Sequence, residues 1–357
     1  MRPTPERANS EIRPLVVNEE ITMGTLEQGA RNAVRVCMNL GSGENALIIT
    51  DRGTEPIGRE LARQCELVTD PQRVKLVLLE DYTKRPMDSL PGEILDLASS
   101  WADVTFWAAK SLPGELVARR KFLDTAKVHA RHAHMPNVTV PLMEQGMCSD
   151  YEVVHKLTHR VYELVKDCDS MTVTNRFGTS LRVEFEPSWR WVASDGRYHT
   201  KGRWGNLPEG ETFTAPKRAE GTIVTNLLGD WFSEKYGNFT DPLSLRIEGS
   251  RIVLDSIECA NQEIKRDIRS YLEADTNSTR ASEFALPTNP LLMSLPTIGN
   301  LLQDEKARVH IAFGDPYQTE TGAPWKCKTH VDMLLEQCDI SAEGRGQIMK
   351  EGKYTFH

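Results

Sequence analysis

The chain has 357 residues, of which 39% are hydrophobic and 26% are charged, and its formal net charge is −8. This size allows two domains or one large α/β unit. An acidic chain without a basic run is a poor partner for nucleic acid or for an anionic membrane, so the expected partner is a small molecule or a peptide end.

The first twenty residues are rich in proline and charge, which predicts a flexible tail over 1–20. No apolar block follows the arginines of this tail, so no signal peptide is expected. Nor does any apolar run approach the roughly eighteen residues that a membrane span requires. The seven cysteines are scattered and form no CxxC pair, which favours reduced thiols and a cytoplasmic location.

Residues 21–148 alternate between helical and strand patterns. This alternation is typical of βαβ units, so we expect an α/β domain with a parallel sheet over this range. The predicted helices are Thr25–Met38, Glu55–Cys65, Leu90–Ser99 and Gly114–Thr125, and the predicted strands are Asn45–Thr50, Val74–Leu79 and Asp103–Ala108.

The pattern changes after residue 148. Tyr151–Val165 is a long amphipathic segment, which we expect to bridge the two halves as a helix. Short strands separated by turns follow it, and Glu263–Glu273 is the clearest helix among them. The expected second domain, residues 149–357, is therefore mainly β (α+β), and we expect it to bind metal and carry the catalytic site. The predicted strands are Met171–Asn175, Leu181–Glu186, Thr222–Asn226, Leu243–Glu248 and Arg251–Asp255.

Several residues of this second half are potential metal ligands. His330 and Asp332 are two apart in a strand-like run, so they point to the same face and can hold one ion together. A set of acids, imidazoles and a phenol suits zinc, manganese, cobalt or ferrous iron. The full set is Glu211, Glu283, His310, Tyr317, His330 and Asp332.

Each of these residues also has a structural interpretation. Glu211 follows a Pro-Gly turn and could be a solvated loop acid, with Glu209 as a competing ligand. Glu283 could stand at the edge of a helix or strand. A lone histidine in a strand, such as His310, is more often a hydrogen-bonded core residue. His330 and Asp332 could form a hydrogen-bonded pair that only orients the imidazole ring of His330.

Other histidines and glycines are weaker candidates. His155 and His159 have the i, i+4 spacing of a zinc-binding helix but lack an adjacent glutamate, which favours an ordinary amphipathic helix. His132 and His134 would share one face of a strand and could form a second ion site, but we interpret them, with His129, as loop histidines. The 41–43 turn lacks the third glycine of a dinucleotide fingerprint, so no nicotinamide cofactor is expected.

Four segments resemble the aminopeptidase T family of metallopeptidases, and the order of the ligands and the interval from His310 to Tyr317 agree with that family. The resemblance implies a site for two divalent ions, Zn, Co or Mn, held by all six residues named above. It also implies a hydrolase that removes N-terminal residues, an α/β first domain and a homodimer. The matching segments are Asn206–Pro216 with Glu220–Thr222, Ser282–Leu286, His310–Gly314 with Tyr317, and His330–Asp332.

The same fold also resembles the 2,5-dihydroxypyridine ring-opening dioxygenases, through local similarities at Gly202–Trp204 and Gln337–Ile340. Glu211, Glu283 and Tyr317 stand against this resemblance, because a mononuclear iron site does not require them. That resemblance implies one ferrous ion held by His310, His330 and Asp332, with open positions for an aromatic substrate and O₂. A third interpretation is a non-catalytic accessory or binding protein on the same fold.

For the hydrolase, the candidate general bases are Glu211 and Glu283, between which the sequence does not choose. Tyr317 is expected either to bind metal or to stabilise the oxyanion.

Overall fold

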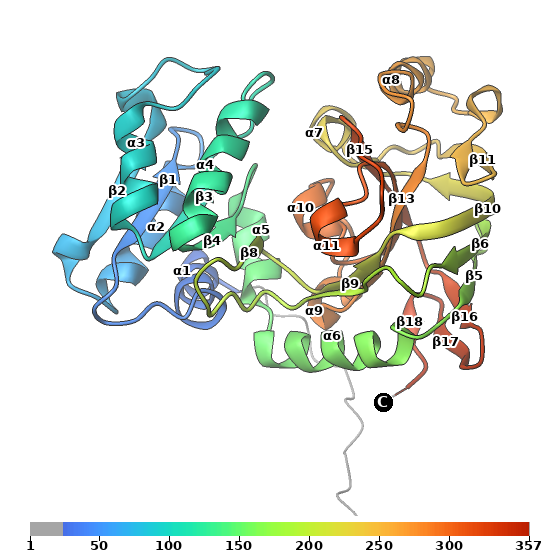
Figure 1. Cartoon of the computed structure of the whole chain (residues 1–357), viewed down its shortest axis with the longest axis horizontal. Helices are drawn as coiled ribbons and strands as arrows, with labels where there is room; N and C mark the ends of the chain where they lie inside the picture. Colours follow the sequence, from blue (N-terminus) through green and yellow to red (C-terminus); the bar gives the residue numbers. More distant parts are fainter. Residues whose placement is uncertain (1–23, 357) are drawn as a thin grey trace, which may run out of the picture.

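The structure is a computed structural model that describes residues 24–356. Its elements form two parts joined by a long helix (Figure 1). The α/β class predicted from the sequence is confirmed, because a parallel sheet is combined with two antiparallel sheets. The tail predicted at 1–20 lies outside the described residues. Within the described residues, no helix combines the length and the apolar character needed to cross a bilayer.

The first part contains a five-stranded parallel sheet in the order β2-β1-β3-β4-β8. Both faces of this sheet are covered, because alternate residues of one strand enter different cores. Ile48 packs in one core and Ile49 in the other. The strands are β1 (Ala46–Thr50), β2 (Val74–Leu78), β3 (Val104–Ala108), β4 (Arg131–His134) and β8 (Trp204–Asn206).

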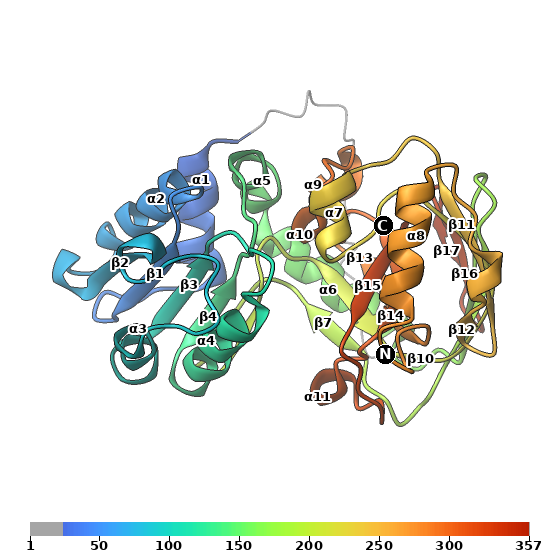
Figure 2. The same cartoon turned by 90° about the horizontal axis from the view of Figure 1, so that it is seen from above.

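The helices of the first part lie on both sides of this sheet, with α1 and α2 on one side and α3 and α4 on the other (Figure 2). Pro141 is the second residue of α5, in the first turn, where its fixed φ suits the helix and its missing N–H leaves no helical bond unmade. These helices are α1 (Leu26–Arg31), α2 (Glu55–Glu66), α3 (Gly92–Asp96), α4 (Leu116–His129) and α5 (Val140–Glu144).

The second part contains two antiparallel sheets that share one core. The eight-stranded sheet has the order β12-β11-β10-β6-β5-β16-β17-β18, and the five-stranded sheet has the order β15-β14-β13-β9-β7. The first contains β5 (Ser170–Thr174), β6 (Ser180–Phe185), β10 (Pro216–Thr225), β11 (Leu243–Glu248), β12 (Arg251–Ile252), β16 (Asp339–Ala342), β17 (Gly346–Lys350) and β18 (Lys353–Tyr354). The second contains β7 (Val192–Ser194), β9 (Glu211–Thr214), β13 (Ala281–Pro287), β14 (Val309–Gly314) and β15 (His330–Leu335).

The helices of the second part are mostly short. The longest of them, α8, buries Ile264, Ile268 and Leu272 in the core between the sheets, at the i, i+4 spacing of one helix face. These helices are α7 (Trp231–Tyr236), α8 (Gln262–Leu272), α9 (Pro290–Ser294), α10 (Leu301–Asp304) and α11 (Gln318–Thr321).

The chain passes between the two parts more than once. Helix α6 (Tyr151–Val165) leads into the second part and runs beneath it (Figure 1). After β7 the chain returns to add β8 to the first sheet, and it then crosses again to begin β9. Although β8 lies beyond residue 148, it belongs to the sheet of the first part. The segments before and after β8 therefore both connect the two parts.

Most predicted elements are present with ends shifted by a few residues. The main error concerns His132 and His134, which were interpreted as loop histidines. They lie on β4 and are buried, because this short strand pairs on both sides, with β3 and with β8. The predicted strand over 251–255 is also too long, since β12 ends at Ile252.

Candidate metal centre

Strand register places five of the predicted ligands on one face of the five-stranded sheet. Glu283 on β13 lies opposite Ala312 on β14, which in turn lies opposite Asp332 on β15. Because directly paired residues point to the same face, and residues two apart do so as well, His310 and His330 join this face. The fifth ligand, Glu211, is the first residue of β9. It is paired with Pro287, which lies four residues beyond Glu283 on β13.

Small residues separate these ligands and leave room between them. Ala312 stands between Glu283 and Asp332 in one register row, and Gly314 is paired with His330 in the next. Gly229 lies against Asp332 of β15, and a Cβ at this glycine would come within 2.6 Å of Oδ2 of that aspartate. Only glycine therefore allows the backbone to approach this carboxylate so closely.

The ligand atoms form two groups of three that share Glu283. Glu211, Glu283 and His310 form one group, and Glu283, His330 and Asp332 form the other, with all donor atoms of a group within 4.8 Å of one another. Oε1 of Glu283 lies 3.7 Å from Nε2 of His310, and Oε2 lies 3.5 Å from Nε2 of His330. The two oxygens of one carboxylate thus face two different imidazoles.

The remaining contacts complete each group. Nε2 of His310 lies 3.6 Å from Oε2 of Glu211, and Nε2 of His330 lies 3.3 Å from Oδ1 of Asp332. Hydrogen bonds at Nδ1 fix the orientation of both rings. Nδ1–H of His310 donates to the carbonyl of Arg308, and Nδ1–H of His330 donates to the carbonyl of Asp315. Nε2 of each imidazole is therefore left to face the centre.

The electrostatics of the centre favour a cation. Burial alone would lower the pKa of His310, but Glu283 and the nearby acids outweigh it and raise that pKa to about 9. The pKa of His330 is raised to about 10 against the same effect of burial, chiefly by Asp332. Burial would raise the pKa of Asp332, but His330 lowers it to about 2. For Glu283, burial prevails and raises the pKa. The imidazoles thus lie in a strong negative potential.

Glu211 has two oxygens in different environments. Oε1 accepts a hydrogen bond of 2.5 Å from Nζ of Lys306. Oε2 is buried and has no hydrogen-bond partner within the described part of the chain, and it faces His310. A buried carboxylate oxygen without a partner is costly unless a cation or a proton satisfies it. This oxygen is therefore the observation on which the centre's fit to a metal ion rests.

Lys306 was not predicted from the sequence. Its side chain is 2% exposed, and its ammonium also lies 3.3 Å from Glu209 and 2.9 Å from Glu305. Burial would lower the pKa of Lys306, but these acids and Glu211 raise it well above its ordinary value, so the ammonium stays charged. Glu209, considered above as a competing ligand, instead pairs with this lysine. In the sequence, a Glu-Lys pair in a charged run looks like a solvated surface.

Tyr317 lies beside the centre. Its backbone is left-handed, with φ 49° and ψ 61°, at the start of α11, and its ring packs on His330 at 4.7 Å between centroids. Tyr317 as a whole is 39% exposed, but burial of its hydroxyl and the charges of Glu283 and Asp332 raise the pKa of that hydroxyl well above the ordinary value. The Tyr317 hydroxyl is therefore protonated at neutral pH and available as a hydrogen-bond donor.

The first part contributes a cationic group. Nη1 of Arg119, on α4, lies 3.1 Å from Nε2 of His134, and Nδ1 of this histidine lies 3.2 Å from Nε2 of His132. Burial lowers the pKa of both histidines, that of His132 to about 3, so the rings are neutral. Among the described residues, no carboxylate lies within ion-pair distance of Arg119. Burial and the neighbouring Arg120 lower the pKa of Arg119, and the charge of Asp230 in the second part acts in the opposite direction.

These features define a class: α/β proteins with a carboxylate and imidazole centre built to hold divalent cations. The family model of the thermophilic metalloproteases (M29) matches residues 102–332, more than half of the chain. The chain therefore belongs to the M29 metalloprotease family, which agrees with the resemblance found in its sequence. The matched range contains all five centre ligands and Tyr317.

Curated relatives agree with this family. Aminopeptidase T of Thermus aquaticus is 28% identical over 203 residues, covering 50% of this chain and 47% of that protein. Aminopeptidase 2 of Geobacillus stearothermophilus is 26% identical over 174 residues, covering 42% and 40%. The matched region thus spans less than half of the length of these relatives.

Two solved structures share the fold over nearly the whole chain. AmpT from Thermus thermophilus has a TM-score of 0.69 at 18% identity, covering 93% of this chain and 99% of its own. A 2,5-dihydroxypyridine dioxygenase from Pseudomonas putida KT2440 has a TM-score of 0.67 at 18% identity, covering 93% and 97%. The two neighbours have different activities, so the fold alone does not select a reaction.

Proposed function

We propose that this protein is a metal-dependent hydrolase of the aminopeptidase type, acting on peptides or related amides with a free N-terminus. The observation that carries the proposal is the sharing of Glu283 between two three-ligand groups, which suits two ions with one bridging carboxylate. Membership of a metalloprotease family supports the same activity.

The donor set fits divalent cations such as Zn²⁺, Co²⁺ or Mn²⁺. Glu211, Glu283 and His310 would hold one ion, and Glu283, His330 and Asp332 the other. Ions bound there would supply a water of lowered pKa and would polarise the scissile carbonyl. The orphaned Oε2 of Glu211 is the buried group that such a cation would satisfy.

The chain's own side chains would handle protons and orientation. Lys306 fixes Oε1 of Glu211, so Oε2 stays directed into the centre, where it would ligate an ion. Glu211 and Glu283 both remain candidate general bases, because each also faces an imidazole of the centre. The O–H of Tyr317 can donate a hydrogen bond to negative charge that develops on the substrate oxygen.

Arg119 would receive the other end of the substrate. Its guanidinium contacts the neutral imidazole of His134, and among the described residues it has no carboxylate partner. An arginine in such a position binds a carboxylate through two parallel hydrogen bonds. We therefore expect short peptides with a free C-terminal carboxylate to bind better than their C-terminal amides.

The experiment that tests this proposal compares three substrates under air and under argon. Dipeptides with a free N-terminus, the same peptides acetylated, and 2,5-dihydroxypyridine are incubated with protein supplied with Zn²⁺, Co²⁺, Mn²⁺ or Fe²⁺. The proposal expects release of the first residue from the free peptide alone, at the same rate without O₂. Consumption of the pyridine that requires O₂, with no peptide cleavage, would replace the hydrolase by an oxygenase. No turnover in any combination would favour a binding protein.

A further inference from the structure

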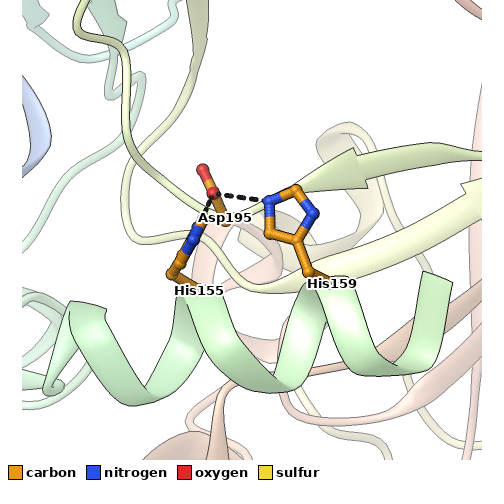
Figure 3. A group of neighbouring side chains, drawn as sticks. All are labelled: His155, His159 and Asp195. Carbon is orange, nitrogen blue, oxygen red and sulfur yellow. Dashed lines mark hydrogen bonds and ion pairs between the residues drawn. The ribbon is translucent and has the colours of Figure 1, made fainter. Parts of the chain in front are cut away.

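A second group of potential ligands lies outside the centre, on the bridging helix. His155 and His159 are one turn apart on α6 and point to the same side, towards Asp195 (Figure 3). Nδ1 of His155 lies 2.5 Å from Oδ2 of Asp195, and Nε2 of His159 lies 3.2 Å from the same oxygen. The donor atoms of the three residues lie within 4.8 Å of one another.

Histidines four apart on a helix form a natural chelating pair, because one helical turn brings both rings over the same point. Two imidazoles and a carboxylate are ligands that zinc and its neighbours bind readily. Tetrahedral bonds of ordinary length would separate neighbouring donors by about 3.4 Å. The contact of His159 with the acid is already close to this separation, and that of His155 requires the ring to move back by less than one ångström.

Neighbouring groups hold the acid in position for this role. Oδ1 of Asp195 accepts from the backbone N–H of Arg197, so the other oxygen faces the histidines. The guanidinium of Arg197 is directed away, 2.9 Å from Oε1 of Glu152.

The group is open to solvent, unlike the centre. The side chain of His159 is 50% exposed and that of His155 is 34% exposed, whereas Asp195 is 14% exposed. A small hydrated ion can therefore reach the donors without any opening of the fold, and water can complete its coordination.

The position of this group in the fold indicates a structural role. Helix α6 is the first connection from the first part to the second, and Asp195 begins the segment by which the chain returns from β7 to β8. An ion held by both would cross-link two of the connections between the parts. From Asp195 the same chain continues through β8 to Glu211 in the centre.

We propose that His155, His159 and Asp195 form a separate surface site for one transition-metal ion, such as Zn²⁺. The bound ion would cross-link two of the connections between the two parts. The site does not depend on the proposed hydrolase activity, since none of its ligands belongs to the centre.

The test measures Zn²⁺ binding to the full chain after removal of metal with a chelator. The His159→Ala variant is expected to bind one equivalent of Zn²⁺ fewer than the wild type. Loss of a residue that only hydrogen-bonds to a ligand already lowers metal affinity roughly 10- to 100-fold, and loss of a ligand itself lowers it further. The matched control is His129→Ala, which removes an exposed histidine at the end of α4 and should bind as the wild type does. Circular dichroism checks that each variant is folded, and Asp195→Asn gives a second reading of the same site.

Equal stoichiometry in the wild type and in both His159→Ala and Asp195→Asn would overturn the proposal, as would uptake of the additional Zn²⁺ only at millimolar concentration. The Asp332→Asn variant separates this site from the centre. Combining it with His159→Ala should remove more Zn²⁺ than Asp332→Asn alone, and an equal loss would show that the two changes affect the same ion.

Discussion

The ammonium of Lys306 and the carboxylate of Glu211 form a buried ion pair at the edge of the candidate centre, with 2.5 Å between Nζ and Oε1. The pair occupies one oxygen of the acid and directs the other towards His310. Lys306 thereby contributes to the charge of the centre and to the orientation of one of its ligands.

Replacement of Lys306 by methionine should destabilise the protein strongly. The change keeps most of the side-chain volume but leaves Glu209, Glu211 and Glu305 without their common cation, and removal of one partner from a buried ion pair costs about 3–5 kcal/mol. Urea unfolding of metal-free protein measures the loss. Lys235→Met, which removes an exposed paired lysine, should cost less than about 1 kcal/mol. Equal losses for the two variants would refute the role of Lys306.

Replacement of Glu283 by glutamine should abolish hydrolysis while leaving the fold intact. Both oxygens of this residue face imidazoles, so a neutral amide removes the charge shared by the two ligand groups. Peptide turnover should fall by at least about 100-fold, the lower end of what a positioned catalytic carboxylate contributes. The control is Glu248→Gln, a substitution of an exposed glutamate on β11. A Glu283→Gln variant with undiminished turnover would show that this carboxylate is not required.

Gly229→Ala should disturb the centre through contact alone. The added methyl would lie 2.6 Å from Oδ2 and 2.9 Å from the backbone nitrogen of Asp332, so the carboxylate or the strand must shift. We expect weaker Zn²⁺ binding and a cost of about 1–3 kcal/mol in stability. Gly43→Ala is the matched control, because a Cβ at Gly43 meets no atom within 4 Å. Retention of wild-type Zn²⁺ affinity by Gly229→Ala would show that the contact is not restrictive.

Acid should weaken the first part through the buried pair of Asp51 and Arg85. Burial alone would raise the pKa of Asp51, but hydrogen bonds from Arg85, from the Lys110 amide and from Thr54 outweigh it, and the net pKa is lowered. The folded state therefore gains stability from this group above the ordinary carboxyl pKa of about 4, and loses it as the pH falls below that value.

This prediction is checked by urea unfolding between pH 7 and pH 3. Asp51→Asn should lower stability at neutral pH and should flatten the decline towards pH 3. Asp88→Asn, a change at an exposed aspartate, should leave the profile as it is. An unchanged slope in Asp51→Asn would contradict the assignment.

Arg119→Met should raise the KM for short peptides. The change removes the guanidinium but keeps a long side chain on α4, so the loss should be confined to binding of the substrate carboxylate. Loss of a charged hydrogen bond of this kind corresponds to about 1.5–3 kcal/mol, or roughly 10- to 150-fold in KM. Peptide amides, which lack the carboxylate, are the control substrates. Equal effects of the variant on acids and amides would rule out this pairing.

The centre shows what sequence patterns predict and what they miss. His330 and Asp332 could be assigned to one face, because strand periodicity is a local property. Assignment of Glu211 and Glu283 required the resemblance, because the register between distant strands brings them together. Lys306 was missed since a lysine in a charged run carries no sign of burial. His132 was misplaced because a four-residue strand is too short for a clear pattern.

The pairing of His155 with Asp195 is another contact that sequence does not predict. The two residues are forty positions apart, and the spacing of the histidines alone indicated only an amphipathic helix. The boundaries predicted for the two domains also could not include the return of β8 to the first sheet, since its three residues pair with a strand some seventy positions earlier.

Metal stoichiometry tests the central claim most directly. The His159→Ala protein, which lacks the proposed surface site, is loaded with Zn²⁺, dialysed and analysed by mass spectrometry for metal per chain. The ligand arrangement predicts two equivalents, and fewer than two when Glu283→Gln is added to the same protein. A chain that retains no divalent ion, or one whose zinc content is unaffected by Glu283→Gln, would contradict the account.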